Sequence, residues 1–125
     1  MIDLNNASFI KLNMVGNDAF SSQIMPILID GETILSSYKG IRDGVVFTNK
    51  RIITVNIQGI TGKKKDFTSM PYSKIQVYSV ETSGVLDMDS ELELWFSGVG
   101  KVKFEFTRNS NVSEICKSIS NFVLK

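Results

Sequence analysis

The sequence predicts a mainly β protein, an antiparallel sandwich or barrel that is followed by one amphipathic helix. Two patterns support this fold class. Between Thr33 and Thr107, short runs rich in β-branched and aromatic residues are separated by turn-forming residues, which is typical of antiparallel β-structure. After Ser110 the apolar residues change to helical spacing. The chain of 125 residues is long enough for one hydrophobic core, and we expect a single domain.

The first part of the chain, residues 1–30, has mixed periodicity and predicts a helical extension in front of the β domain, residues 31–125. Asn17 or Asp18 is placed to cap the start of a helix. Pro26 argues against a long helix, because proline lacks the amide hydrogen that a helix interior needs. One helical face would consist of Ala19, Phe20, Ile24, Ile27 and Leu28.

Seven strands are predicted in the β domain from runs of β-forming residues with turn residues between them. Their predicted bounds are Ile34–Lys39, Asp43–Phe47, Arg51–Ile57, Lys64–Met70, Lys74–Glu81, Glu91–Ser97 and Lys101–Thr107.

The last two predicted strands show a strict alternation of apolar and polar residues. Their apolar faces match only if the loop between them has an odd number of residues, since one residue of slip reverses every side chain. A three-residue loop over residues 98–100 meets this condition. It places Leu94 opposite Phe104 and Trp95 opposite Lys103, with Trp95 on the outer, charged face.

The C-terminal segment from Ser110 to Lys125 predicts a helix that packs on the sheet. Asn111 and Glu114 approximate a capping box at its start. Its apolar stripe is formed by Val112, Ile115, Cys116, Ile119, Phe122 and Val123. Cys116 lies on this stripe, so we expect it to contribute to packing.

The composition argues against several classes of protein. The chain has no histidine and one cysteine, which removes the usual catalytic dyads and the usual zinc ligands. The acidic stretch Leu86–Glu93 lacks the spacing of a calcium loop and is typical of a solvated strand face. We therefore expect no enzymatic activity, no catalytic residues, no metal and no cofactor.

Charge and hydropathy restrict the location and the partners. The net charge is +1, from 14 basic and 13 acidic residues, so no global field attracts the protein to nucleic acid. The aromatic residues of the last strands alternate into the core and do not line a basic groove. The first residues lack the features of a secretory signal, and no apolar run is long enough to span a membrane. We expect a cytoplasmic protein that binds no nucleic acid.

The one dense basic cluster is Lys63, Lys64 and Lys65, in the sequence "NIQGITGKKKDF". With Lys39 and Arg42 it is a candidate site for an anionic ligand or a membrane surface, helped by free amide groups near the glycines. The alternative interpretation is a polar turn whose charges protect a strand edge. Successive side chains on a strand point to opposite faces, so the three lysines would not all meet one ligand.

Four stretches of the sequence resemble the bacterial pleckstrin-homology (PH)-like domain family. They are "GVVFTNKRIITV", "GKKKDFTSMPYSKIQVYSVETSG", "DSELELWFSG" and "VKFEF", and the resemblance extends from Gly31 to Leu124. It implies a partly open seven-stranded antiparallel barrel that a C-terminal helix plugs, and assembly into ring-like homo-oligomers. Eukaryotic relatives bind phosphoinositides around the first hairpin, which here offers Lys39 and Arg42 beside Asp43.

An outward tryptophan on a strand indicates a contact surface, because tryptophan is enriched at interface hot spots. Trp95 lies on the charged face of its strand, where it would stack on Lys103 or contact another subunit. Tyr78 and Val80 are predicted to face outward as well. We therefore expect a non-enzymatic module that self-assembles into a homo-oligomer and presents a surface to another protein. The alternative is a module that binds an anionic ligand or a membrane surface through the basic hairpin.

Overall fold

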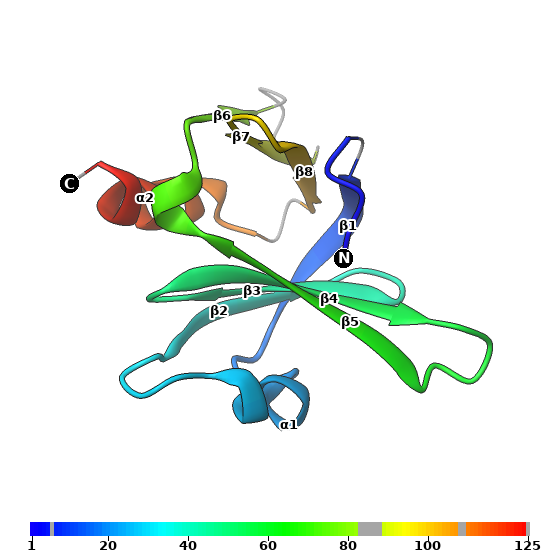
Figure 1. The fold of residues 1–125 in the computed structure, drawn as a ribbon. Helices are drawn as coiled ribbons and strands as arrows, with labels where there is room; N and C mark the ends of the chain where they lie inside the picture. The colour runs from blue at the N-terminus through cyan, green and yellow to red at the C-terminus, as the bar shows by residue number, and fades with distance from the viewer. Residues whose placement is uncertain (6, 83–88, 108–109, 125) are drawn as a thin grey trace.

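The computed structural model describes residues 1–5, 7–82, 89–107 and 110–124. Within these residues the chain forms eight strands, two α-helices and two 3-10 helices (Figure 1). The strands are β1 (Ala7–Val15), β2 (Ile34–Lys39), β3 (Asp43–Thr48), β4 (Arg51–Gln58), β5 (Lys64–Pro71), β6 (Val77–Glu81), β7 (Ser90–Phe96) and β8 (Gly100–Phe106). The helices are α1 (Ser21–Ile24), η1 (Met25–Ile27), η2 (Tyr72–Lys74) and α2 (Val112–Val123).

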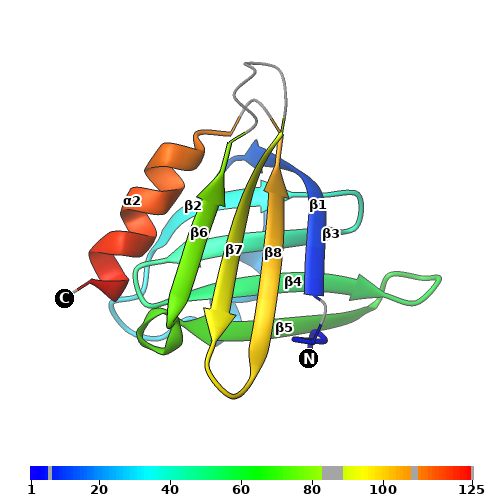
Figure 2. The ribbon, with the colours of Figure 1, turned by 90° about the horizontal axis from the view of Figure 1, so that it is seen from above.

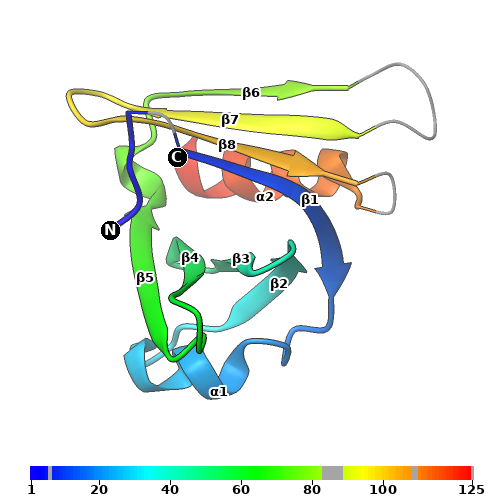
Figure 3. The same ribbon diagram turned by 90° about the vertical axis from the view of Figure 1, so that its right-hand side faces the viewer.

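All eight strands belong to one sheet with the order β5-β4-β3-β2-β1-β8-β7-β6. The sheet folds over so that β6–β8 lie across β2–β5, and the core fills the space between the two layers (Figures 2 and 3). β5 and β6 are the free edges of the sheet, so the barrel does not close completely. The predicted partly open barrel is confirmed. The helix α2 lies beside β6 and covers the opening next to it (Figure 2).

Strand β1 is the eighth strand, and it lies in the segment for which the sequence predicted a helical extension. It pairs antiparallel with β2 and parallel with β8, and so joins the two layers. The strand is irregular between Phe9 and Leu12, and Lys11 has a φ of 54°. A bulge of this kind interrupts the alternation of a strand. Phe9 and Leu12 are both buried although they are three residues apart, which is why the segment does not resemble a strand.

The helical part of the N-terminal region is limited to α1 and η1, with Pro26 in the first turn of η1. These short helices lie on the outside of the β2–β5 layer (Figure 3). Phe20 and Ile24 pack there against Val46, Ile53 and Val55 in a second, smaller core. Strands β3 and β4 are therefore buried on both faces, which explains their nearly continuous apolar sequences.

The bounds of the other strands agree closely with the prediction, except around β6. The predicted strand Lys74–Glu81 begins instead at Val77, after the 3-10 helix η2. The phase of the side chains changes between Ile75, which directly follows this helix, and Val77, where β6 begins. Ile75 is buried, whereas Val77 is exposed and Tyr78 packs against the core.

The loop between β7 and β8 begins one residue earlier in the chain than predicted, and this changes the register of the two strands. Leu94 lies opposite Val102 and Trp95 opposite Lys101, so the loop consists of residues 97–99 and still has three residues. Gly100 belongs to β8 because the N-terminal segment crosses it closely: an added Cβ there would lie 2.1 Å from the Leu4 carbonyl oxygen. The Lys101 amide donates a hydrogen bond to the same oxygen, at 2.8 Å. The glycine thus permits a close backbone approach and is not part of the loop.

The main core is built from aromatic and aliphatic residues of both layers and of α2. Tyr72 of η2 stacks on Phe122 of α2 with ring centroids 4.6 Å apart. The predicted cap of α2 is confirmed, because the Asn111 side chain accepts a hydrogen bond from the Glu114 amide at 3.3 Å. Val112, Ile115 and Ile119 of the predicted stripe are buried. Full burial of such a side chain contributes roughly 1.5–3 kcal/mol.

One ion pair connects the segment after η1 to β4. The Arg51 guanidinium donates to both carboxylate oxygens of Glu32, at 2.9 Å each, and to the Ile27 carbonyl oxygen at 2.6 Å. The Thr48 hydroxyl donates to the same carboxylate at 2.7 Å. In the described part of the chain, no helix is long and apolar enough to cross a membrane.

Candidate functional site

The outer face of β6 and β7 carries an exposed apolar pair, Trp95 and Val77. Trp95 is 45% exposed and Val77 59% exposed, and the two residues are direct partners in the pairing of β6 with β7. β6 is also a free edge of the sheet. An edge strand leaves backbone amide and carbonyl groups unpaired, so apolar side chains and hydrogen-bonding groups occur together here.

Charged residues border this pair on the outer face of β7 and β8. Lys101 forms an ion pair with Glu93 at 3.3 Å, and Lys103 forms one with Glu91 at 3.9 Å. The predicted pairing of Trp95 with Lys103 is wrong, since Trp95 lies opposite Lys101 and Lys103 lies opposite Glu93. The cause is the register shift at Gly100. Exposed ion pairs of this kind contribute little stability.

The outward orientation predicted for Tyr78 and Val80 is wrong. Both side chains are partly buried and pack against the main core. The Tyr78 hydroxyl lies 2.8 Å from the Ser120 hydroxyl of α2, within hydrogen-bonding distance. The phase change between Ile75 and the start of β6 turns these side chains inward and brings Val77 to the surface. The alternation of a strand does not extend from Ile75 to Val77, because Ile75 and Gln76 lie between η2 and β6; the exposure of Val77 was therefore not predicted from the sequence.

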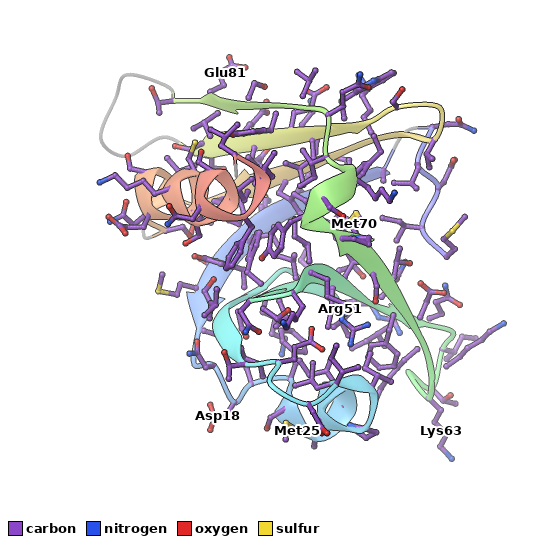
Figure 4. All side chains as sticks on the ribbon, turned by 60° about the vertical axis from the view of Figure 1, so that its left-hand side comes forward. Asp18, Met25, Arg51, Lys63, Met70 and Glu81 are labelled. Atoms are coloured by element: carbon purple, nitrogen blue, oxygen red, sulfur yellow. The ribbon has the colours of Figure 1, made fainter. Side chains whose placement is uncertain are left out.

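The structure brings two of the basic segments together. Arg42, in the turn between β2 and β3, donates a hydrogen bond at 2.7 Å to the Gly59 carbonyl oxygen in the loop between β4 and β5. Lys63 ends that loop, Lys64 and Lys65 begin β5, and all three residues are exposed. Lys63 lies at the far end of the β4–β5 hairpin, away from the body of the molecule (Figure 4). Lys39 is exposed at the end of β2, where it pairs with Gly44 and Asn13.

Two isoleucines at these turns were not singled out by the sequence analysis. Ile41, next to Arg42, is 79% exposed, and Ile60, next to Gly59, is fully exposed. A hollow of about 310 Å³ adjoins the first turn and is lined by Ile10, Ile41 and Arg42 among others. The sequence offers one indication of these exposed residues. Each is an isoleucine in the middle of a turn sequence, "KGIRDG" or "QGITG", and turns consist mostly of polar residues and glycine.

Burial and hydrogen bonds within the fold shift the pKa values of Glu32 and Tyr72. Burial raises the pKa of Glu32, but hydrogen bonds from Arg51, Thr48 and the Ile29 amide outweigh burial and lower this pKa below its ordinary value. Burial also raises the pKa of Tyr72, whose hydroxyl donates to the Thr48 carbonyl oxygen at 2.7 Å. Within the described ranges, no group of three or more metal-ligating side chains is positioned to hold a metal ion. Asp87, in the acidic stretch, lies outside the described residues.

An orthogonal, partly open barrel with a terminal helix across its opening defines the PH-like class. The family model described as "Bacterial PH domain" matches residues 3–123. This chain therefore belongs to the bacterial PH domain family. The match includes β1, so the added strand lies within the region that the family model covers.

Known proteins similar to this chain support the same assignment. The uncharacterized Bacillus subtilis protein YjqA is 42% identical over 104 residues, covering 82% of this chain and 83% of that protein. The uncharacterized B. subtilis protein YozO is 31% identical over 101 residues, covering 81% and 87%. A crystal structure of a DUF1696 family protein with a pleckstrin-homology domain, from Shewanella loihica, is 41% identical with a TM-score of 0.79, covering 90% of this chain and 97% of that chain. A pleckstrin homology domain from Shewanella amazonensis is 41% identical with a TM-score of 0.68, covering 89% and 90%.

Proposed function

We propose that this protein is a non-enzymatic binding module that self-associates through the outer face of β6 and β7 and presents a surface to another protein. The observation that carries this proposal is the exposed pair of Trp95 and Val77 on an edge of the sheet. Tryptophan at the centre of a contact contributes strongly to binding, because it buries a large apolar surface. The cytoplasmic location stays a prediction.

Ring-like assembly follows from the resemblance to bacterial PH-like domains and stays part of the proposal. A contact between the outer face of β6 and β7 and a different face of the next copy is heterologous, and heterologous contacts close into rings when the rotation permits. The neighbouring ion pairs, Glu93 with Lys101 and Glu91 with Lys103, would form a polar rim around an apolar centre.

The proposal is tested by the mass in solution, measured by light scattering after size exclusion at low and high salt. The wild-type protein is expected to form a multimer that persists at high salt, because an apolar contact is not screened. Trp95→Lys and Val77→Lys are expected to lower the mass while the circular dichroism spectrum stays unchanged. Ile29→Lys is the matched control, since Ile29 is 61% exposed and is expected to leave the mass unchanged. A monomeric wild-type protein would contradict the proposal.

A second candidate function is binding to an anionic lipid surface through the turns β2–β3 and β4–β5. The hydrogen bond from Arg42 to Gly59 connects the two turns, and each turn exposes an isoleucine beside basic residues. Apolar tips with basic residues around them suit a bilayer interface, where side chains enter the headgroup region and cations meet anionic lipids. Lys39 would add charge from the end of β2.

Sedimentation with vesicles tests this second function. Binding to vesicles of phosphatidylglycerol is expected to exceed binding to phosphatidylcholine and to decrease with salt. Replacing Lys63, Lys64 and Lys65 with Ser should reduce binding at every salt concentration. The double variant Ile41→Ser and Ile60→Ser should reduce the binding that remains at high salt. Equal binding by the wild type and both variants would exclude this function.

A further inference from the structure

A second hollow lies next to the start of β6 and the end of β7, where Gln76 and Phe96 line it. It has a volume of about 640 Å³ and is situated where β5 turns through η2 into β6. The turn between β7 and β8 and the N-terminal segment form its other walls. The hollow adjoins the place where the sheet does not close, because β5 and β6 are its free edges. Its volume falls in the range of small-molecule sites, roughly 300–1,000 Å³.

The floor and one wall of this cavity are apolar. Met70, Ile75 and Phe96 form the buried floor, with 5% exposure or less. Leu4 and Val99 extend the apolar surface toward the rim. Val99 is exposed in the turn after β7, so an entering molecule would cover surface that is now in contact with water.

The polar residues of the lining come from two segments of the chain. Ser73, Lys74 and Gln76 come from η2 and the segment before β6, and Ser97 comes from the turn between β7 and β8. Among the described residues, none of these four side chains has a hydrogen-bond partner or an ion pair. The other hydroxyl groups of the lining form hydrogen bonds within the protein. The Ser69 hydroxyl accepts a hydrogen bond from Arg51 at 2.9 Å. The Thr68 hydroxyl accepts one from the Ile2 amide at 3.1 Å and donates one to Asp66 at 2.8 Å.

The charge of the lining restricts what the cavity can hold. The described residues that line it include no aspartate and no glutamate. Lys74 supplies an ammonium group that makes no ion pair with a described residue, and the amine of Met1 pairs with Asp66. An ammonium group at the polar end of an apolar cavity complements a ligand with one anionic head and an apolar chain.

We infer that this cavity binds a long-chain carboxylic acid, with its carboxylate at Lys74 and its chain on Met70, Ile75 and Phe96. This function goes beyond self-association and does not use Trp95, Val77 or the basic turns. The ammonium group and the hydroxyl of Ser73 donate hydrogen bonds to the carboxylate. The chain displaces water from the apolar floor, which is the main source of affinity for such a ligand.

Isothermal titration of the full chain with dodecanoate, below the concentration at which it forms micelles, tests this inference. Saturable binding is expected, and octanoate should bind roughly tenfold more weakly or worse, because each buried methylene adds to the affinity. Lys74→Gln should weaken dodecanoate binding up to about tenfold and leave the binding of dodecanol unchanged. Lys117→Gln, at an exposed position of α2, is the matched control and should change the binding of neither ligand.

Two variants at the rim test the location of the chain. Ser97→Phe would fill the cavity from an exposed turn position, and Val99→Asp would place a carboxylate beside the bound chain; both should weaken dodecanoate binding. Thermal unfolding checks that each variant is folded. If one variant does not fold, the other variant alone tests the location of the chain. No saturable binding by the wild type would overturn the inference. Dodecanoate binding unchanged in the folded rim variants, or equally reduced by Lys117→Gln, would also overturn it.

The same variants distinguish a second copy of the chain as the occupant. If another subunit filled the cavity, Ser97→Phe would lower the mass in solution and dodecanoate would dissociate the multimer. That result would overturn the inference. An unchanged mass together with weakened dodecanoate binding would support it, whatever Trp95→Lys does to self-association.

Discussion

Glu32 is a carboxylate whose side chain is fully buried, and it is held by four hydrogen bonds. A buried charge without partners is strongly unfavourable, whereas a paired and hydrogen-bonded charge is tolerated. Arg51 supplies the opposite charge, and its other hydrogen bonds reach Ile27 and Ser69. One side chain of β4 therefore connects η1, the segment after it and β5.

The first prediction concerns the Glu32→Gln variant. Loss of the carboxylate leaves the Arg51 guanidinium without its counter-charge, and the free energy of unfolding should decrease by about 3 kcal/mol. Denaturation with urea measures this change. Glu81→Gln is the control, since Glu81 is exposed at the end of β6, and its effect should be close to zero. A decrease equal in both variants would show that the buried pair contributes nothing specific.

The second prediction follows from the lowered pKa of Glu32. The unfolded chain binds a proton near the ordinary value of 4.5, whereas the folded protein binds it only at lower pH. The pair's contribution is therefore complete above pH 4.5 and is lost as the pH falls toward the folded pKa. Unfolding free energies measured between pH 6 and about 3 should decrease more steeply for the wild type than for Glu32→Gln. Parallel curves would contradict this assignment.

At the scale of elements, α1 and β3 meet at Gly44. An added Cβ at Gly44 would lie 2.2 Å from the Cζ atom of Phe20, and Phe20 is buried in the smaller core. The absence of a side chain at Gly44 is thus what allows the end of the Phe20 ring to approach β3 so closely. The small helix covers this face of β3 and β4 because the ring fits there.

The third prediction is the effect of Gly44→Ala on this contact. The added methyl overpacks the site, and the free energy of unfolding should decrease by about 1–3 kcal/mol. Phe20→Leu removes the clashing ring atoms, so Gly44→Ala should cost less in that background. A double-mutant cycle by chemical denaturation measures the coupling. Additive effects of the two substitutions would show that the ring and the glycine do not interact.

At the scale of the whole molecule, β1 is the element that makes one barrel from two layers. Its N-terminal part pairs with β8 and its C-terminal part pairs with β2. Leu12 lies at the bulge between these parts, has no exposed surface and pairs with Phe106. Damage at Leu12 should therefore affect both layers of the sheet together.

The fourth prediction is that Leu12→Ala lowers the free energy of unfolding by about 2–5 kcal/mol while one cooperative transition remains. Hydrogen exchange should show faster exchange in β3–β4 and in β7–β8 alike, because both layers pack on β1 through the same core. Val80→Ala is the comparison, since Val80 is partly buried at the edge and should cost less. Faster exchange confined to one layer would contradict this account.

The sequence by itself determined the elements that depend on local pattern. Strand β2 has the predicted bounds Ile34–Lys39, and α2 has the predicted cap Asn111 and a buried stripe. Strict alternation and capping are written in residues that are close in the chain, so they can be recognised without the rest of the fold. The outward position of Trp95 was predictable for the same reason.

The tertiary structure alone decided the features that depend on distant segments. The parallel pairing of β1 with β8 joins the two ends of the chain, and the bulge between Phe9 and Leu12 conceals the strand in the sequence. The Leu4 carbonyl explains why Gly100 lies in β8. The interruption at Ile75 and Gln76, between η2 and β6, explains why Val77 replaces Tyr78 at the surface. The bond from Arg42 to Gly59 brings two separate turns together. Each of these outcomes is a contact between residues that sequence periodicity treats as independent, so local pattern carries no record of them.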